Sequence, residues 1–191
     1  EKNIIIADHF TGISIYKGDH FATWSDEKML PDKSVYAVEE DELGRYWFGT
    51  NNGLSIYDPK GKGKNEIQFI NSIGNKIRFI KSDGKGTVWI VTDGFGLFRY
   101  DIKSAKFIYD TRVNKFLHYN GIITALAIDK KERLWIGNMD RLVMFDASSD
   151  TVYYYSQENG LAGTCITALY CDNNNNVWIG SENKTGLTKF N

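Results

Sequence analysis

A short pattern centred on tryptophan occurs four times along this chain of 191 residues. The four copies contain Trp47, Trp89, Trp135 and Trp178, which are separated by 42, 46 and 43 residues. A fifth, weaker copy at 4–16 has Ile5 in place of tryptophan. A repeat of this length cannot bury its apolar residues alone, so each unit must pack against its neighbours.

Each copy predicts the same order of β-strands. An apolar stretch such as "ITALAID" at 123–129 ends in an aspartate, and we expect it to form an innermost strand that is covered on both faces. Residues that favour turns follow, and the aspartate carboxylate is expected to accept backbone N–H groups there. The tryptophan then begins a second strand and fills the space between neighbouring units. The aspartates, each six residues before a tryptophan, are Asp41, Asp83, Asp129 and Asp172.

These units match the four-stranded blades of an all-β propeller. No stretch shows a helical period over three turns. We expect a single propeller segment of about 18 strands, or about four and a half blades. The predicted boundaries are a partial blade at 1–33, full blades at about 34–75, 76–120 and 121–163, and a partial blade at 164–191.

The composition excludes several classes of partner. Lys and Arg total 23 against 24 Asp and Glu, without a block of like charge, so we expect no binding to nucleic acid. The longest apolar runs are far shorter than the ~20 residues of a membrane helix, so this segment is not expected to enter a membrane. Cys165 and Cys171 lie too far apart along one predicted strand for a disulfide and are expected to be buried free thiols.

The order of apolar strand, Asp, turn, "WIG"-like strand, Gly-Leu and "RYD" resembles the two-component regulator propeller repeat. The resemblance covers nearly the whole chain and departs from the pattern at Ile5 and Arg141. It implies the periplasmic sensor region of a hybrid two-component system, with a ring of about seven blades that responds to glycan fragments and signals to a histidine kinase outside this chain. The start "EKNII" lacks Met and an apolar signal core, which is consistent with a segment of a larger protein.

If the ring is incomplete, its terminal blades are expected to associate with another copy or with the rest of the propeller. Any ligand is expected to be an oligosaccharide bound by the loops between second and third strands, because these loops vary from copy to copy on a shared face. The alternative is that the loops vary because nothing constrains them, with the phenylalanines packed between blades. The candidate ligand-binding residues are Phe10, Asn51, Asn52, Asp93, Phe95, Asp140, Glu182 and Asn183.

Three other features have simpler interpretations. The tyrosines at 152–156 are better explained by an outer strand with alternate rings packed inward than by an exposed aromatic platform. The run at 172–176 lacks the glycine and distal glutamate of a calcium loop and predicts a polar turn. Of His9, His20 and His118, only His9 lies on the candidate face, and no histidine belongs to a nucleophile or metal motif.

We therefore predict a non-enzymatic sensor segment with no catalytic residue, metal or cofactor. Two alternatives remain open. Streptogramin lyases are similar Trp-rich propellers that use a histidine base with a divalent metal, and other repeat rings are protein-interaction scaffolds. Fold alone does not decide among them.

Overall fold

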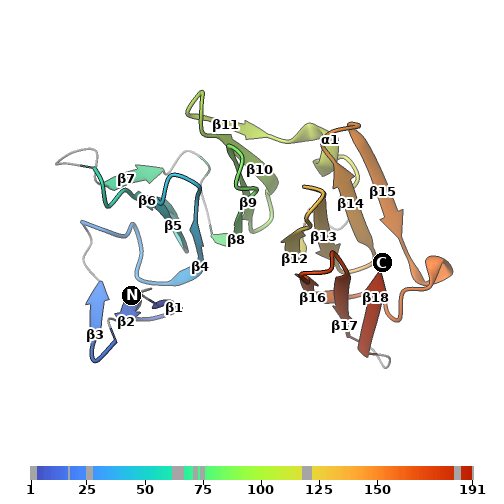
Figure 1. Cartoon of the computed structure of the whole chain (residues 1–191), viewed down its shortest axis with the longest axis horizontal. Coiled ribbons are helices and arrows are strands. Elements are labelled where there is room, and N and C mark those ends of the chain that lie inside the picture. The colour runs from blue at the N-terminus through green and yellow to red at the C-terminus, as the bar shows by residue number, and fades with distance from the viewer. Residues whose placement is uncertain are drawn as a thin grey trace. The chain divides into compact units, whose positions relative to one another are not determined.

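The fold is described from a computed structural model, whose described residues are 4–16, 18–24, 28–61, 67–70, 73, 76–117, 122–182 and 186–190. Across these residues the chain is all β, with strands β1 to β18 in five antiparallel sheets of three or four strands, as Figure 1 shows. The prediction of a propeller built from four-stranded blades is confirmed. The predictions concerning His118 and Asn183 lie outside the described residues.

The chain divides into two compact units, which are described separately. Unit 1 comprises Glu1–Asp93 and Phe98–Tyr109, and unit 2 comprises Gly94–Leu97 and Asp110–Asn191. The first sheet of unit 1 contains β1 (Ile4–Asp8), β2 (Gly12–Tyr16) and β3 (Phe21–Trp24). The second contains β4 (Val35–Glu40), β5 (Tyr46–Thr50), β6 (Gly53–Tyr57) and β7 (Ile67–Ile70). The third contains β8 (Ile77–Ser82), β9 (Thr87–Thr92), β10 (Gly96–Asp101) and β11 (Lys106–Tyr109).

Unit 2 contributes the last two sheets. The fourth contains β12 (Ile123–Ile128), β13 (Leu134–Asn138), β14 (Leu142–Asp146) and β15 (Thr151–Tyr155). The fifth contains β16 (Ile166–Cys171), β17 (Val177–Ser181) and β18 (Gly186–Phe190). Two helical turns accompany them, α1 (Thr111–Asn114) and the 3-10 turn η3 (Gln157–Asn159). No helix in the described part of the chain is long and apolar enough to cross a membrane.

Within each unit a tryptophan lies between successive sheets, as the sequence predicts. In unit 1, Trp47 is fully buried and packs with Val88 and Ile90 of the third sheet, and its ring lies 5.0 Å from that of Tyr100. In unit 2, Trp135 packs with Val177 and Ile179 of the fifth sheet. Burial of each such aliphatic side chain contributes about 1.5–3 kcal/mol, so contacts between sheets supply much of the stability of each unit.

The aspartate before each tryptophan closes the turn between the first two strands. Asp41 Oδ1 accepts the backbone N–H groups of Leu43 and Arg45, both at 3.0 Å, and Asp83 Oδ1 accepts those of Lys85 and Thr87. This prediction is confirmed. The sequence did not predict the role of the second oxygen: Asp41 Oδ2 accepts the indole Nε1–H of Trp47 at 2.8 Å.

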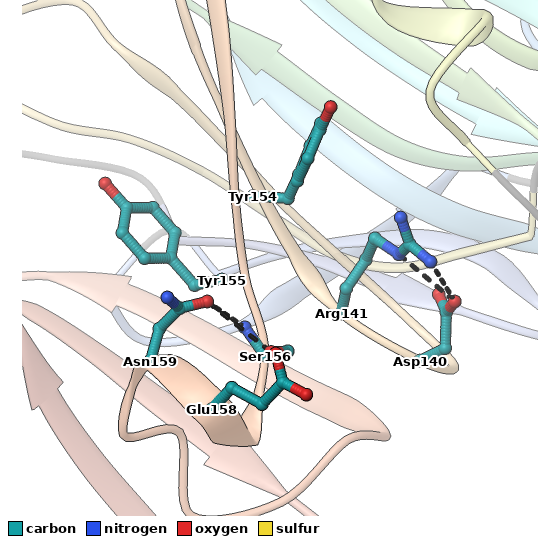
Figure 2. A pocket seen from close by; sticks show the side chains of 7 residues that line it. All are labelled: Asp140, Arg141, Tyr154, Tyr155, Ser156, Glu158 and Asn159. Carbon is teal, nitrogen blue, oxygen red and sulfur yellow. Dashed lines mark hydrogen bonds and ion pairs between the residues drawn. The ribbon is translucent and has the colours of Figure 1, made fainter.

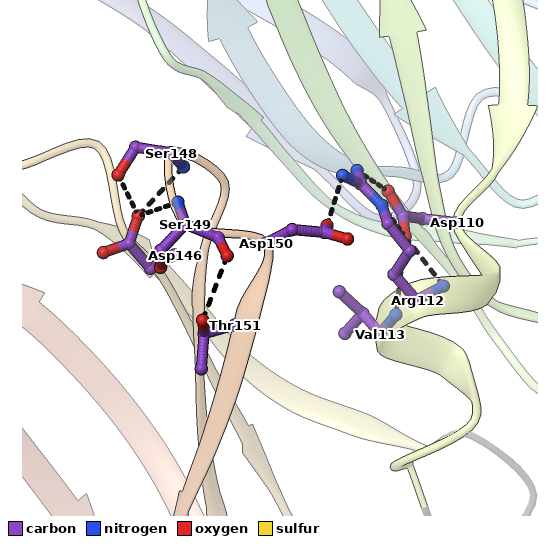
Figure 3. A network of polar contacts seen from close by, with 8 residues as sticks. All are labelled: Asp110, Arg112, Val113, Asp146, Ser148, Ser149, Asp150 and Thr151. Atoms are coloured by element: carbon purple, nitrogen blue, oxygen red, sulfur yellow. Dashed lines mark hydrogen bonds and ion pairs between the residues drawn. The ribbon is translucent and has the colours of Figure 1, made fainter.

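The short helix α1 is held by a polar network, shown in Figure 3. Asp110 caps the helix, and the Arg112 guanidinium bridges Asp110 at 2.6 Å and Asp150 at 3.0 Å while lying over the ring of Phe145. Hydrogen bonding to Asp110 raises the pKa of Arg112 above its usual value. The network therefore ties the segment before the fourth sheet to the hairpin between β14 and β15.

Both cysteines are free, as predicted, but only Cys165 is buried. Cys171 ends the innermost strand of the fifth sheet and is half-buried, so the expectation of two fully buried thiols is wrong for this residue. Burial still raises the pKa of the Cys171 thiol to about 11, which keeps it protonated at neutral pH.

Candidate functional site

Every innermost strand carries a register shift of one residue at the same place. In β4, Val35 pairs with Thr50 and Ala37 with Gly49, so Tyr36 is left without a partner in the neighbouring strand. The equivalent residues of β8, β12 and β16 are Arg78, Thr124 and Thr167. Such β-bulges redirect a side chain out of the regular pattern. The same backbone feature thus presents a tyrosine, an arginine and two threonines in these four sheets.

The loops between second and third strands lie beside these bulges. The backbone N–H of Asn51 donates to the carbonyl of Ser34 at 3.0 Å, that of Asp93 to Lys76 at 2.8 Å, and that of Glu182 to Cys165 at 2.9 Å. Each accepting residue immediately precedes an innermost strand. The variable loops and the bulged residues therefore form one end of each sheet, the loop end.

At the loop end of unit 1, charged and aromatic side chains gather around Tyr36. The ring of His9 meets the Tyr36 ring edge-on at 4.2 Å, and Lys76 Nζ lies 4.0 Å from the centre of the same ring. Arg78 Nη1 lies 3.6 Å from Asp93 Oδ2. A cation over an aromatic face is worth about 0.5–1 kcal/mol at an exposed site, so Tyr36 and Lys76 position each other.

At the loop end of unit 2, a pocket of about 280 Å³ opens between the β13–β14 loop and the segment that follows β15. Figure 2 shows how its side chains lie, with Tyr154 extending from β15 and Arg141 from the loop between β13 and β14. The lining residues are Asp140, Arg141, Tyr154, Tyr155, Ser156, Glu158 and Asn159.

One wall of this pocket is an ion pair. Arg141 donates to Asp140 Oδ2 from Nε at 3.1 Å and from Nη2 at 2.9 Å, and its guanidinium lies 5.9 Å from the centre of the Tyr154 ring. The buried Asn138 orients the pair, because its Oδ1 accepts the backbone N–H groups of Asp140 and Arg141. Asp140 Oδ1 has no hydrogen-bond partner among the described residues.

The opposite wall is fixed by the turn η3. The backbone N–H of Ser156 donates to Asn159 Oδ1 at 3.0 Å, and Gly160 ends the turn in a left-handed conformation with φ of 92°. Tyr155 points inward and packs on Trp135 and Phe190. The pocket thus combines one exposed aromatic ring with a preorganised set of donors and acceptors.

Two stretches, 29–52 and 160–183, match the family model described as two component regulator propeller. Each stretch contains an innermost strand, its aspartate turn and the tryptophan strand. The chain carries two-component regulator propeller repeats.

Solved structures share the fold of this chain. The extracellular domain of BT3049 from B. thetaiotaomicron, described as a hybrid two component system, matches with a TM-score of 0.78 and 24% identity, covering 100% of this chain and 25% of that one. PorZ, a surface component of the type-IX secretion system of Porphyromonas gingivalis, matches with 0.74 and 15% identity, covering 98% and 31%. Virginiamycin B lyase from Staphylococcus aureus matches with 0.66 and 13% identity, covering 94% and 62%.

At these identities the likenesses show the fold alone, and the chain spans about a quarter of the first structures it matches. A comparison with curated proteins found no match.

The predicted ligand residues do not form one site, and they are described here unit by unit. In unit 1, Asn51 and Asn52 are exposed on one loop, and Asp93 is half-buried against Arg78. Phe10 is exposed on the β1–β2 turn, where Asp8 accepts the backbone N–H groups of Phe10 and Thr11; these hydrogen bonds lower the pKa of Asp8.

In unit 2, only Asp140 of the predicted residues lines the pocket. Glu182 lies in the loop after β17, where its carboxylate is 3.8 Å from the Cys165 thiol. Burial is the main cause that raises the pKa of this thiol, and the nearby Glu182 carboxylate raises it further. Phe95 is exposed, like Phe10, so the alternative in which both rings pack between blades is wrong. Both rings lie in short turns between strands, Phe10 between β1 and β2 and Phe95 between β9 and β10.

The tyrosine run was only partly predicted. Tyr155 packs inward as expected, but Tyr153 and Tyr154 are 49% and 50% exposed, so the expectation of alternate inward rings is wrong for Tyr153. Tyr153 pairs with Met144 on the face of the fourth sheet that is turned toward the fifth sheet. In the described residues the fifth sheet has only three strands, so no outermost strand covers the Tyr153 ring. Tyr154 lines the pocket, so the exposed aromatic platform that the sequence disfavoured is partly present.

Sequence reasoning also missed the bulged residues and Arg141. A usable signal existed, because each innermost strand begins with a β-branched residue that is followed by one of three residue types: "VY", "IR", "IT" and "IT". The run at 172–176 does form a turn closed by Asp172, as predicted. Among the described residues, no group of three or more His, Cys, Asp or Glu side chains is arranged to hold a metal ion.

Proposed function

We propose that this chain is part of the periplasmic sensor region of a hybrid two-component system and binds a glycan fragment at the loop end of its sheets. The regulator propeller repeats support the sensor assignment, as does the likeness to extracellular domains of two component systems. The kinase lies outside this chain. The ligand acts by favouring one arrangement of the sensor over another, which requires different affinities for the two.

The pocket of unit 2 is the observation that carries the glycan assignment. A sugar ring presents an apolar face to an aromatic side chain and hydroxyl groups to charged donors and acceptors. Tyr154 offers half of its surface for stacking, and beside it lies the ion pair of Arg141 and Asp140, in which both guanidinium nitrogens donate to Asp140 Oδ2.

The size of the pocket limits the ligand. Its volume of about 280 Å³ lies just below the range of about 300–1,000 Å³ typical of small-molecule sites. We expect one or two sugar rings to be bound there, with the remainder of a longer fragment in solvent. In unit 1, the contact of Lys76 with the Tyr36 ring and the Arg78–Asp93 ion pair offer a second place for polar ligands.

The test is isothermal titration calorimetry of the purified chain with fractionated oligosaccharides. Tyr154→Ala and Arg141→Ala are expected to weaken binding by at least about tenfold, the effect of one lost stacking or charged contact. Tyr153→Ala is the matched control, because Tyr153 is equally exposed on the same strand but does not line the pocket. Equal effects of the two tyrosine substitutions would contradict the site.

The same samples test the non-enzymatic assignment. We expect the bound oligosaccharide to be recovered unchanged, as followed by NMR over several hours. Accumulation of a cleaved product, lost on removal of divalent metal, would instead favour the lyase alternative.

A further inference from the structure

Three side chains that can bind a metal ion meet at the loop end of the fourth and fifth sheets. Cys165 Sγ lies 3.7 Å from Met139 Sδ and 3.8 Å from Glu182 Oε2. Met139 belongs to the β13–β14 loop, Cys165 directly precedes β16, and Glu182 directly follows β17. The group therefore bridges two neighbouring sheets of unit 2, and none of its members lines the glycan pocket.

The Cys165 thiol has more acceptors than it can serve. It carries one proton, while the Met139 thioether and the Glu182 carboxylate both lie within reach of its sulfur. The thiol can donate to only one of them at a time, and S–H is a weak donor. A cation in place of the proton would contact the sulfur and both acceptors together.

The spacing of these atoms suits a single ion. Two sulfur ligands at about 2.3 Å from a metal lie about 3.8 Å apart when they subtend a tetrahedral angle. A sulfur at about 2.3 Å and an oxygen at about 2.1 Å lie about 3.6–3.8 Å apart at angles of about 109–120°. Both separations from Cys165, 3.7 Å to the thioether and 3.8 Å to the carboxylate, agree with these values.

The types of ligand identify the kind of ion. A thiolate and a thioether are soft ligands, which favour Cu(I) among the metal ions common in proteins. Structural Zn²⁺ sites use four Cys, His or carboxylate ligands. Cys165 and Glu182 supply two such ligands, and among the described residues no third His, Cys, Asp or Glu joins them. The Met139 thioether therefore favours a monovalent soft ion over Zn²⁺.

The thiol lies below two more exposed side chains. Cys165 is 7% exposed, whereas Met139 is 46% exposed and Glu182 is exposed at the surface. Burial raises the pKa of the Cys165 thiol, so the sulfur is protonated at neutral pH in the absence of metal. An ion reaches the sulfur from the side of Met139 and Glu182 and must displace the thiol proton.

We propose that Met139, Cys165 and Glu182 form a binding site for one Cu(I) ion. The S–H bond breaks as the sulfur–copper bond forms, the proton passes to solvent, and no electron is transferred. The bound ion links the β13–β14 loop of the fourth sheet to the fifth sheet, so it stabilises unit 2 against unfolding. This proposal does not rest on glycan binding.

The test is a competition titration of the purified chain against a chromophoric Cu(I) chelator, under argon and with ascorbate as reductant. The wild type is expected to take up one Cu(I) ion per chain. Cys165→Ser is expected to weaken binding by at least about a hundredfold, and Met139→Leu by at least about tenfold, because each removes one soft ligand at nearly constant volume. Because Met139 is exposed, Met139→Leu keeps the test valid if Cys165→Ser fails to fold.

Cys171→Ser and Met144→Leu are the matched controls. Cys171 lies six residues beyond Cys165 along the same strand, at about 20 Å, and Met144 lies within β14 and is buried. Neither substitution should change Cu(I) binding. Absence of Cu(I) uptake by the wild type would overturn the proposal, and so would wild-type affinity in Cys165→Ser or loss of binding in Cys171→Ser.

X-ray absorption at the copper edge distinguishes the shared site from capture by the thiol alone. We expect two sulfur neighbours of copper in the wild type and one in Met139→Leu. A single sulfur neighbour in the wild type would show that Met139 is not a ligand, and the shared site would be wrong. Tyr154→Ala should bind Cu(I) as the wild type does, which separates this test from that of the glycan pocket.

Discussion

Asp129 Oδ2 accepts a hydrogen bond from the indole Nε1–H of Trp135 at 2.9 Å, and both residues are buried. The same carboxylate accepts the backbone N–H groups of Lys131 and Arg133 through Oδ1 and the Arg133 side chain through Oδ2. One aspartate therefore closes the turn, pairs an arginine and orients the ring that fills the space between sheets. This explains why the aspartate and tryptophan keep a spacing of six residues.

Asp129→Ala should lower the free energy of unfolding by about 3 kcal/mol, because it leaves a buried indole N–H and an arginine without their acceptor. Urea denaturation measures the change. Asp146→Ala is the control, since Asp146 closes an exposed turn by accepting from Ser148 and its loss should cost little. Equal losses of stability in the two variants would show that closing the turn, and not the buried contact of Asp129 with Trp135, accounts for the effect of Asp129→Ala.

Gly137→Ala should destabilise the chain by about 1–3 kcal/mol, the usual cost of overpacking. The added methyl would lie 2.5 Å from Ile166 Cγ2. Gly180→Ala makes the same change where the nearest atom is 3.3 Å away, so thermal unfolding should differ little from wild type. A larger loss for Gly180→Ala than for Gly137→Ala would contradict the packing described between the fourth and fifth sheets.

Stability should fall in acid partly through Asp172. Hydrogen bonds from the side chains of Asn176 and Trp178 hold the pKa of this carboxyl well below its usual value of 3.8. A lowered folded-state pKa contributes stability that is present above about pH 4 and is lost as the pH falls further, because protonation removes the acceptor. Asp172→Asn should therefore lose less thermal stability than wild type between about pH 5 and pH 2. Parallel pH profiles for the two proteins would refute this contribution.

Asn138→Ala should weaken sugar binding as well as stability. The Asn138 side chain orients the backbone of Asp140 and Arg141, so its removal loosens one wall of the pocket. We expect a loss of about 1–2 kcal/mol in stability and at least about a fivefold rise in Kd.

Thr50→Ala is the matched control for Asn138→Ala. Thr50 Oγ1 holds the equivalent loop of unit 1, accepting from Asn52 and donating to the Gly53 carbonyl. Its loss should reduce stability without changing binding in unit 2. Weaker binding in Thr50→Ala would show that the effect of Asn138 is not local to the pocket.

The repeat made the sheets predictable, because the strands of each copy lie at nearly constant distances from its tryptophan. The Asp41 turn and the burial of Trp47 follow from local chemistry and were predicted. The pocket was not, because it depends on how the β13–β14 loop meets the segment after β15, and this pairing is set by the register of β14 with β15. Similarly, the bulge at Tyr36 is a property of pairing between strands, which the pattern of β4 alone does not show.

The most direct test of the account is amide hydrogen exchange of the chain with and without a saturating oligosaccharide. We predict slower exchange at 138–142 and 154–160, the two segments that form the pocket, and no change at 129–135, the aspartate turn at the opposite end of the same sheet. Protection confined to 129–135, or none at either pocket segment, would contradict a glycan site at the loop end.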